Sequence, residues 1–278
     1  MVREFSAPTK IAHNIHHLMR GTTNSKSTHT SASLEKCQAL ILAGGLGTRL
    51  RSAFDVGPKS MAPVGGRYFL EYLLDWLRSA GIRELILCVG HKKSQIQNWL
   101  DDGREWGLHI RYSVEKKLLG TAGALKLAEK MISGESCFVV NGDSFLGIDL
   151  KEMYQFHVKH RSLATIALAR VRNSARYGTV QLDRKARIVA FREKSAGASK
   201  RGPSSGNLQL INGGVYVLEK QFFDAIPPRK AVSLERDVFP PLVGKNLYGF
   251  VTSGYFIDIG VPADFERAQT ELPKRFCA

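Results

Sequence analysis

The chain has 278 residues, of which 44% are hydrophobic and 23% charged, as is ordinary for folded globular proteins. This length suits one large α/β domain or two small ones, and no apolar run reaches the roughly 18 residues of a membrane span. The net charge of +15 would fit nucleic-acid binding, but no dense Lys/Arg block is interleaved with aromatic residues. We therefore expect no nucleic acid and no membrane as partners. Anionic small substrates fit better, because phosphate-rich ligands also favour positive clefts.

The cysteines and the first residues bear on compartment and domain organisation. No C-x-x-C spacing occurs, and Cys88 and Cys137 lie inside apolar runs, where cysteine is usually a small buried hydrophobe. We expect a cytoplasmic protein without disulfides. Residues 1–36 are rich in Ser, Thr, Asn and His and lack apolar periodicity, which predicts a flexible extension before one domain over residues 37–278. A targeting segment is the alternative for this extension, although it lacks the apolar core of a secretory signal.

From residue 37 to about residue 160, short apolar strands alternate with segments of helical apolar spacing. The pattern predicts strands at residues 39–43, 85–89, 109–114 and 137–140, and helices at residues 69–80, 95–100, 122–131 and 153–160. Such alternation forms right-handed βαβ units, so we expect a Rossmann-like α/β fold with a mixed, mostly parallel sheet flanked by helices.

After residue 164 the predicted strands follow one another closely, which indicates a mixed or partly antiparallel half. The strands are expected at residues 164–170, 179–182, 188–192, 215–218 and 255–259, a loop at 195–207, and helices at 233–238 and 262–272.

A glycine-rich turn follows the first predicted strand, in the string L-A-G-G-L-G-T-R-L at residues 42–50. Glycines let backbone N–H groups approach a triphosphate closely, while Arg49 and Lys59 can neutralise charge on a leaving pyrophosphate. Read alone, such a loop is also compatible with a plain strand-to-helix turn. The string P-K-S-M-A-P-V at residues 58–64 makes the pattern far more specific.

Together these strings closely resemble the signature of the sugar-phosphate nucleotidyltransferases, G-G-x-G-T-R-L followed by P-K-x-M-x-P-V, and the resemblance covers residues 38–272. It implies the nucleotide-diphospho-sugar transferase fold and transfer of a nucleoside monophosphate from a nucleoside triphosphate to a sugar 1-phosphate. It also implies catalytic roles for Arg49 and Lys59. The implied phosphate loop comprises Gly44, Gly45, Gly47 and Thr48.

Two aspartates at motif ends are candidate metal ligands. Asp143 ends N-G-D after a buried strand, and Asp258 lies in F-I-D-I-G. Each has an ordinary alternative, a turn residue for Asp143 and a helix cap for Asp258. The family resemblance implies that both hold Mg²⁺, a hard cation that prefers oxygen ligands and would screen the α-phosphate and the sugar phosphate.

The string Y-S-V-E-K-K-L-L-G-T-A-G at residues 112–123 resembles the family's nucleobase-binding stretch. This implies nucleotide-binding roles for Glu115, Gly120 and Thr121, and Glu115 stands where thymidylyl-transferring relatives have glutamine. A carboxylate only accepts hydrogen bonds, so it fits guanine, which offers two adjacent N–H donors, better than thymine or uracil. The sequence therefore favours GTP; a solvent-exposed charge at a strand end is the alternative for Glu115.

Three later strings, Y-G, E-K and N-G-G, resemble the family's sugar-phosphate elements. Lys194 would neutralise the sugar 1-phosphate, while the Gly178 backbone, Glu193 and Asn212 would bind hydroxyls. Glu-Lys pairs and Gly-Gly turns are common, and Ser195 stands where many relatives have proline, so this group carries the weakest signal.

Within the family, E-K-x-x-L-G-T-A-G-A-L at residues 115–125 and I-G-V-P-A-D-F at residues 259–265 most resemble guanylyltransferases of D-glycero-D-manno-heptose 1-phosphate. This implies GDP-heptose for surface polysaccharide. Mannose 1-phosphate guanylyltransferase and glucose 1-phosphate thymidylyltransferase are the nearest alternatives. A non-catalytic, ligand-sensing paralogue is the alternative outside enzymes, but it would be expected to lose charged residues that this chain retains. The oligomeric state stays open, a homo-oligomer included.

Overall fold

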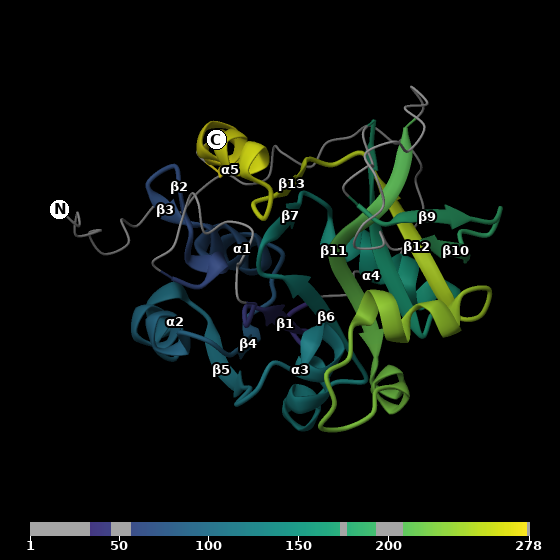
Figure 1. Cartoon of the computed structure of the whole chain (residues 1–278), viewed down its shortest axis with the longest axis horizontal. Helices are drawn as coiled ribbons and strands as arrows, with labels where there is room; N and C mark the ends of the chain where they lie inside the picture. Colours follow the sequence, from purple (N-terminus) through teal and green to yellow (C-terminus); the bar gives the residue numbers. More distant parts are fainter. Residues whose placement is uncertain (1–33, 46–56, 173–176, 193–207, 277–278) are drawn as a thin grey trace.

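The structure, a computed structural model, describes residues 34–45, 57–172, 177–192 and 208–276. Within these residues a nine-stranded mixed sheet forms the centre, in the order β10-β9-β11-β6-β1-β4-β5, with β8 paired to β11 and β12 (Figure 1). The strands are β1 (Gln38–Leu42), β4 (Glu84–Val89), β5 (His109–Val114), β6 (Ser136–Asn141), β8 (Ala164–Val171), β9 (Thr179–Leu182), β10 (Ile188–Arg192), β11 (Gln209–Glu219) and β12 (Leu247–Thr252).

One half of the sheet is parallel, as the βαβ pattern predicts. Strands β6, β1, β4 and β5 run in the same direction, and Leu42 at the end of β1 pairs with both Cys88 and Asn141. The carboxyl ends of these strands therefore meet at one edge, where ligands of open α/β sheets bind. β1, β4 and β6 are near-continuous apolar runs buried on both faces, which makes them recognisable in the sequence. β5, at the edge of the sheet, instead has exposed His109 and Arg111 on either side of buried Ile110.

The other half confirms the antiparallel expectation, because β11 runs antiparallel to β6, β8 and β9. β11 is longer than the predicted residues 215–218. Its first half contains two polar residues and two glycines, which weaken the strand signal, and its register against β8 shifts between Asn212 and Tyr216. β12 was not predicted. Gly249 lowers the strand propensity of this segment. In the structure a Cβ at this position would lie 2.5 Å from the Leu168 side chain of β8, so the close packing of the two strands favours glycine there.

Helices cover both faces of the sheet, and two hydrophobic cores result. Ile41 of β1 faces the core under α1 (Phe69–Ser79), α2 (Lys93–Leu100), α4 (Leu150–His160) and α5 (Pro262–Glu271). Leu40 faces the opposite core, under α3 (Gly120–Ala128), the 3₁₀ helix η4 (Lys220–Ala225) and the π-helix η5 (Leu234–Val238). Three layers follow, and no described helix is long and apolar enough to cross a membrane.

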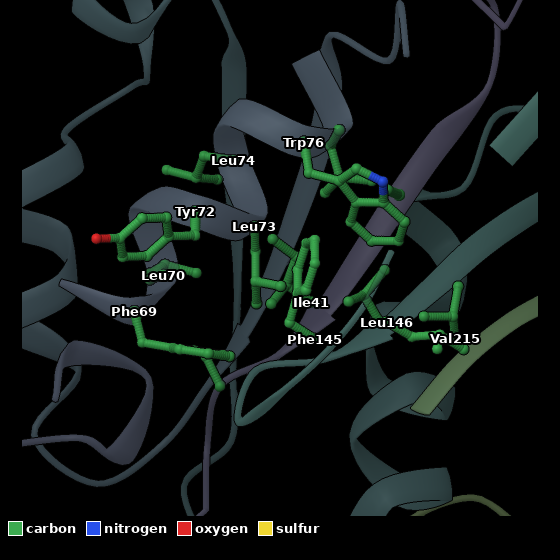
Figure 2. Close-up of a cluster of buried hydrophobic side chains, with 14 of the residues drawn as sticks. Ile41, Phe69, Leu70, Tyr72, Leu73, Leu74, Trp76, Phe145, Leu146 and Val215 are labelled. Atoms are coloured by element: carbon green, nitrogen blue, oxygen red, sulfur yellow. The ribbon is translucent and has the colours of Figure 1, made fainter. Parts of the chain in front are cut away.

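Helix α1 supplies much of the first core. The labelled side chains in Figure 2 show its apolar face, including Leu73 and Trp76, against Ile41 of β1 and Phe145. The Glu71 carboxylate accepts the Tyr68 N–H at 3.2 Å, so it caps the start of the helix. Leu73 is fully buried, and its truncation to alanine is expected to cost about 2–5 kcal/mol.

Two small two-stranded sheets position segments that are distant in the sequence. β7 (Ser144–Leu146) pairs antiparallel with β13 (Phe256–Asp258), which sets Ser144 opposite Asp258. β2 (Pro63–Val64) pairs with β3 (Arg67–Tyr68) in a hairpin next to α5 (Figure 1). Gln269 of α5 donates to Pro63 O at 2.9 Å and so holds this hairpin in place. The remaining short helices are η1 (Lys59–Met61), η2 (Arg104–Trp106), η3 (Glu129–Met131), η6 (Pro240–Leu242) and α6 (Pro273–Phe276).

The predicted helices are present in the structure, with small changes in their bounds and in the type of helix. The expected helix at residues 122–131 starts at Gly120 and tightens into η3, and the one at residues 233–238 is a π-helical turn. The predicted loop at residues 195–207 lies outside the described residues. So do residues 1–33 of the predicted extension, whereas Leu34 is buried in the first core.

Candidate active site

A pocket of about 430 Å³ opens at the carboxyl ends of the parallel strands. Backbone N–H groups of Ala43 and Gly142 donate to Cys88 O and Leu42 O at 2.9 and 3.0 Å, so the segments after β1 and β6 are locked side by side. The predicted site residues that line the pocket are Gly44, Gly45, Lys59, Glu115, Gly120, Thr121 and Asp143. Five others, Gly47, Thr48, Arg49, Glu193 and Lys194, lie outside the described residues.

The Glu115 side chain lies directly over two glycine backbones. A Cβ on Gly44 or on Gly90 would be 2.7 Å from Glu115 Oε1, so a larger residue at either position would displace the Glu115 carboxylate. The other carboxylate oxygen, Oε2, accepts the Leu119 N–H at 2.9 Å. Gly90 was not predicted; the available signal was a glycine directly after the apolar run of β4, at the same sheet edge as Gly44.

Burial raises the pKa of Glu115, and the hydrogen bond from the Leu119 N–H partly offsets that rise. The Glu115 carboxylate is thus a partly desolvated acceptor on the wall of the pocket. A hydrogen bond that a ligand donates to it would be stronger than the same bond in water, because the local dielectric constant is lower.

Lys59 lies between the two predicted metal ligands. Its Nζ is 2.5 Å from Asp143 Oδ2 and 3.7 Å from Asp258 Oδ1, and its side chain is only 14% exposed. Gly260 N donates to Asp258 Oδ1 at 2.7 Å, and any Cβ at Gly260 would collide with Lys59 Nζ. The structure therefore brings three charges, predicted from three separate motifs, to one corner.

The backbone explains why these motifs meet. Ile259 N donates to Asp143 O at 3.0 Å, next to the β7–β13 pairing, so the N-G-D and F-I-D-I-G strings run side by side. Lys59 starts η1, a single 3₁₀ turn closed by Ala62 N donating to Lys59 O. The Lys59 corner is assembled entirely by tertiary contacts.

The donor set at this corner fits Mg²⁺. No group of three or more His, Cys, Asp or Glu residues that could hold a metal occurs in the described part of the chain. Mg²⁺ does not need one, because it is commonly bound by one or two carboxylates together with substrate phosphates and water. Asp143 and Asp258 provide two carboxylates, and Lys59 balances one of their charges.

The start of α3 forms another wall of the pocket. Gly120 has φ +70°, and a Cβ there would be 2.5 Å from Val232 O, so the tight approach of the two segments requires glycine. The Thr121 hydroxyl accepts the Leu234 N–H at 2.8 Å and donates to Glu235 Oε2 at 3.1 Å. Thr121 thus ties the predicted nucleotide loop to η5, a connection that the sequence did not suggest.

The two described sugar-phosphate candidates, Gly178 and Asn212, lie outside the lining of this pocket. The Asn212 amide donates to the Tyr216 hydroxyl at 2.8 Å and accepts the Gly214 N–H at 3.0 Å, which fixes its orientation. Next to Gly178, the Tyr177 hydroxyl donates to Asp264 Oδ2 at 3.0 Å. The Y-G element is therefore anchored to α5, which follows shortly after Asp258.

A parallel sheet edge with glycine backbones, an acceptor carboxylate and a Lys–Asp–Asp corner is the arrangement expected of a nucleotidyltransferase. Residues 38–275 match the nucleotidyl transferase family, and the chain belongs to that family.

Relatives and solved structures agree with this assignment. A D-glycero-alpha-D-manno-heptose 1-phosphate guanylyltransferase from Aneurinibacillus thermoaerophilus is 39% identical over 236 residues, which cover 84% of this chain and 98% of that protein. A mannose-1-phosphate guanylyltransferase from Mycobacterium tuberculosis is 37% identical over 237 residues, 84% of this chain but 64% of its own length. The crystal structure of HddC from Yersinia pseudotuberculosis complexed with GMP-PN has TM-score 0.74 and 31% identity, and covers 85% of this chain and 99% of that chain.

Proposed function

We propose that this enzyme transfers GMP from GTP to a sugar 1-phosphate and releases pyrophosphate, with D-glycero-D-manno-heptose 1-phosphate as the preferred acceptor. The observation that carries the nucleotide assignment is the Glu115 carboxylate, which lines the same pocket as Lys59 and Asp143. The heptose 1-phosphate guanylyltransferase from Aneurinibacillus thermoaerophilus, which the chain matches over nearly the whole of that protein, supports the choice of acceptor.

The guanine assignment follows from hydrogen-bond complementarity. Glu115 Oε2 accepts one backbone N–H, and each carboxylate oxygen has a second lone pair for a ligand. Guanine offers N1–H and an exocyclic amine side by side, whereas thymine and uracil offer one donor between two carbonyls. A partly buried carboxylate would be left facing those carbonyls, which disfavours dTTP and UTP.

Chemistry at this site needs no protein nucleophile, because the sugar phosphate oxygen is already an anion near neutral pH. That oxygen attacks the α-phosphorus in line; a new P–O bond forms, the bond to the bridging oxygen of the β-phosphate breaks, and pyrophosphate leaves with the electron pair. Lys59 and Arg49 would neutralise the charge that develops on the leaving group. Positioning and charge neutralisation then provide the catalysis.

Asp143 and Asp258 would hold Mg²⁺. When bound, Mg²⁺ supplies positive charge between the α-phosphate and the sugar phosphate, which lets two anions approach. Lys194 would bind the sugar phosphate, and Glu193, Asn212 and Gly178 the sugar hydroxyls. We also assign the catalytic domain to residues 37–278, with Leu34 packed into its first core and residues 1–33 outside it, and propose that the enzyme acts in the cytoplasm.

Mannose 1-phosphate is the second candidate acceptor. The mannose-1-phosphate guanylyltransferase from Mycobacterium tuberculosis has nearly the same identity to this chain, although it is substantially longer. Both candidates share GTP, so they differ only on the sugar side of the site.

A pyrophosphate-release assay tests the proposal over GTP, dTTP, UTP and ATP, each paired with the 1-phosphates of D-glycero-D-manno-heptose, mannose and glucose. We expect the highest kcat/KM for GTP with heptose 1-phosphate. A Lys59→Met variant, purified identically, controls for contaminating activity. A preference for dTTP would refute the guanine assignment, and a higher efficiency with mannose 1-phosphate would replace the acceptor.

A further inference from the structure

The Glu235 carboxylate on η5 joins the start of α3 to β11, the strand that carries Asn212. Its Oε2 accepts from the Thr121 hydroxyl at 3.1 Å and from the Ser233 hydroxyl at 2.9 Å. Its Oε1 accepts from the Tyr216 hydroxyl at 3.4 Å. One oxygen thus faces the nucleotide loop and the other faces the strand that carries the sugar-side asparagine.

The arm towards the sugar side is buried and rigid. Tyr216 is fully buried, and burial together with the Glu235 charge raises the pKa of its hydroxyl well above the ordinary value, so the group stays protonated and donates. The same hydroxyl accepts from Asn212 Nδ2 at 2.8 Å, and the Asn212 Oδ1 is held by the Gly214 N–H. Every polar atom of the Asn212 amide therefore has a fixed direction.

The arm towards the nucleotide is fixed from two sides. The Thr121 hydroxyl accepts the Leu234 N–H at 2.8 Å. Val232 adds two backbone hydrogen bonds: its N–H donates to Leu119 O at 2.8 Å, and its carbonyl oxygen accepts the Ala122 N–H at 3.0 Å. The start of α3 and the segment that leads into η5 cannot shift independently. Since Glu235 holds both this arm and the Tyr216 arm, a displacement of one substrate site is transmitted to the other.

We propose that Glu235 is a positioning residue that keeps the nucleotide-binding start of α3 in register with Asn212 on β11 through the Thr121–Glu235–Tyr216 hydrogen bonds. This role rests on the proposed function, in which α3 binds the nucleotide and Asn212 the sugar. In-line transfer requires that the attacking oxygen of the sugar phosphate lies close to the α-phosphorus and is aligned with the bond that breaks. A misplacement of about 1 Å can cost roughly a hundredfold in rate.

The test compares kcat and the two KM values of wild type, Glu235→Gln and Glu235→Ala, with the melting temperature measured alongside. We expect kcat to fall roughly tenfold in Glu235→Gln and about a hundredfold in Glu235→Ala, because hydrogen bonds to a charged group are replaced or lost. Both KM values should change far less than kcat, since neither substrate touches Glu235 in this role. Asp237→Asn is the matched control, because it makes the same acid-to-amide change on η5, at a carboxylate that accepts the Ser233 N–H at 2.7 Å.

Tyr216→Phe separates positioning from packing, because it keeps the ring and removes only the hydroxyl. If the two residues act through one path, the kcat loss of the Glu235→Gln/Tyr216→Phe double variant is clearly smaller than the product of the single losses. Multiplicative losses would overturn the proposal. So would an increase in the KM of the sugar 1-phosphate alone, which would make Glu235 a direct sugar ligand, or a fall in melting temperature with kcat unchanged.

The assay uses whichever nucleotide and sugar 1-phosphate the wild type turns over best. A wild type that prefers another pair refutes the substrate assignment, while the comparison of variants still decides the role of Glu235. The two failures are therefore distinguishable.

Discussion

Lys59 Nζ lies 2.5 Å from Asp143 Oδ2, and this ion pair joins the loop after β1 to the carboxyl end of β6. Asp258 Oδ1 is 3.7 Å from the same ammonium, so these three side chains together carry a formal net charge of −1. This negative charge favours binding of a divalent cation whose remaining ligands are substrate phosphates and water. Substitutions of these three residues test the site directly.

Lys59→Met should lower kcat by roughly a hundred- to a thousandfold, the range typical for the loss of one contact that stabilises transition-state charge. The melting temperature should also fall, because two neighbouring carboxylates lose their cation. Pyrophosphate release and thermal unfolding measure the two effects. Lys126→Met is the matched control, since Lys126 is similarly buried and pairs with Glu129 at 2.8 Å on the far end of α3; it should affect stability alone.

Asp143→Asn and Asp258→Asn should each abolish most turnover while the fold is retained, because an amide binds Mg²⁺ more weakly than a carboxylate. Activity measured against Mg²⁺ concentration should show a higher metal requirement in both variants. Asp149→Asn makes the same change at the N-cap of α4, where asparagine caps equally well, so it should be neutral. Near-wild-type rates at the original Mg²⁺ concentration would remove the residue from the metal site.

Glu115→Gln should lower kcat/KM for GTP by roughly ten- to a hundredfold, because hydrogen bonds to a charged group contribute about 1.5–3 kcal/mol. The preference for GTP over dTTP and UTP should shrink, since one acceptor becomes a donor. Glu129→Gln, on η3 away from the pocket lining, should leave the preference unchanged. An unchanged order of nucleotides in Glu115→Gln would show that backbone groups read the base.

The burial of Glu115 also predicts that Glu115→Gln changes the melting temperature by an amount that depends on pH. Burial raises the pKa of Glu115 in the folded state, so the ionised carboxylate destabilises the fold above that pKa, and the destabilisation disappears as pH falls below the ordinary range of glutamate. Glu115→Gln should therefore melt higher than wild type at pH 8, and the difference should narrow towards pH 4. A constant difference across this range would contradict the assignment of burial as the cause.

Arg49→Ala should lower kcat by about a hundred- to a thousandfold with a much smaller change in the KM of the sugar 1-phosphate, because the guanidinium is predicted to act on the leaving pyrophosphate. Steady-state kinetics with both substrates varied provide the measurement. A variant that loses only substrate affinity would assign Arg49 to ground-state binding instead.

The sequence by itself determined that one half of the sheet is parallel and which edge of that half carries the candidate active site. β1, β4 and β6 are short apolar runs buried on both faces, and such runs can be recognised without any knowledge of their neighbours. β5 has exposed and buried residues in turn, the pattern of a strand at a sheet edge. The glycine strings and the N-G-D string directly follow these strands, so their meeting at one edge could be expected from parallel topology alone.

Only the tertiary structure decided which distant side chains face one another. Asp258 reaches Asp143 through the two-strand pairing of β7 with β13, and Gly90 matters because the Glu115 side chain folds over it. The link from Glu235 to Tyr216 is equally invisible in the sequence, since a glutamate in a short predicted helix and a tyrosine in a predicted strand are each ordinary. Apolar periodicity in the sequence shows which residues of an element are buried. The hydrogen-bond partner of a polar side chain depends instead on how the layers of the fold pack together, and this packing is set only once the chain has folded.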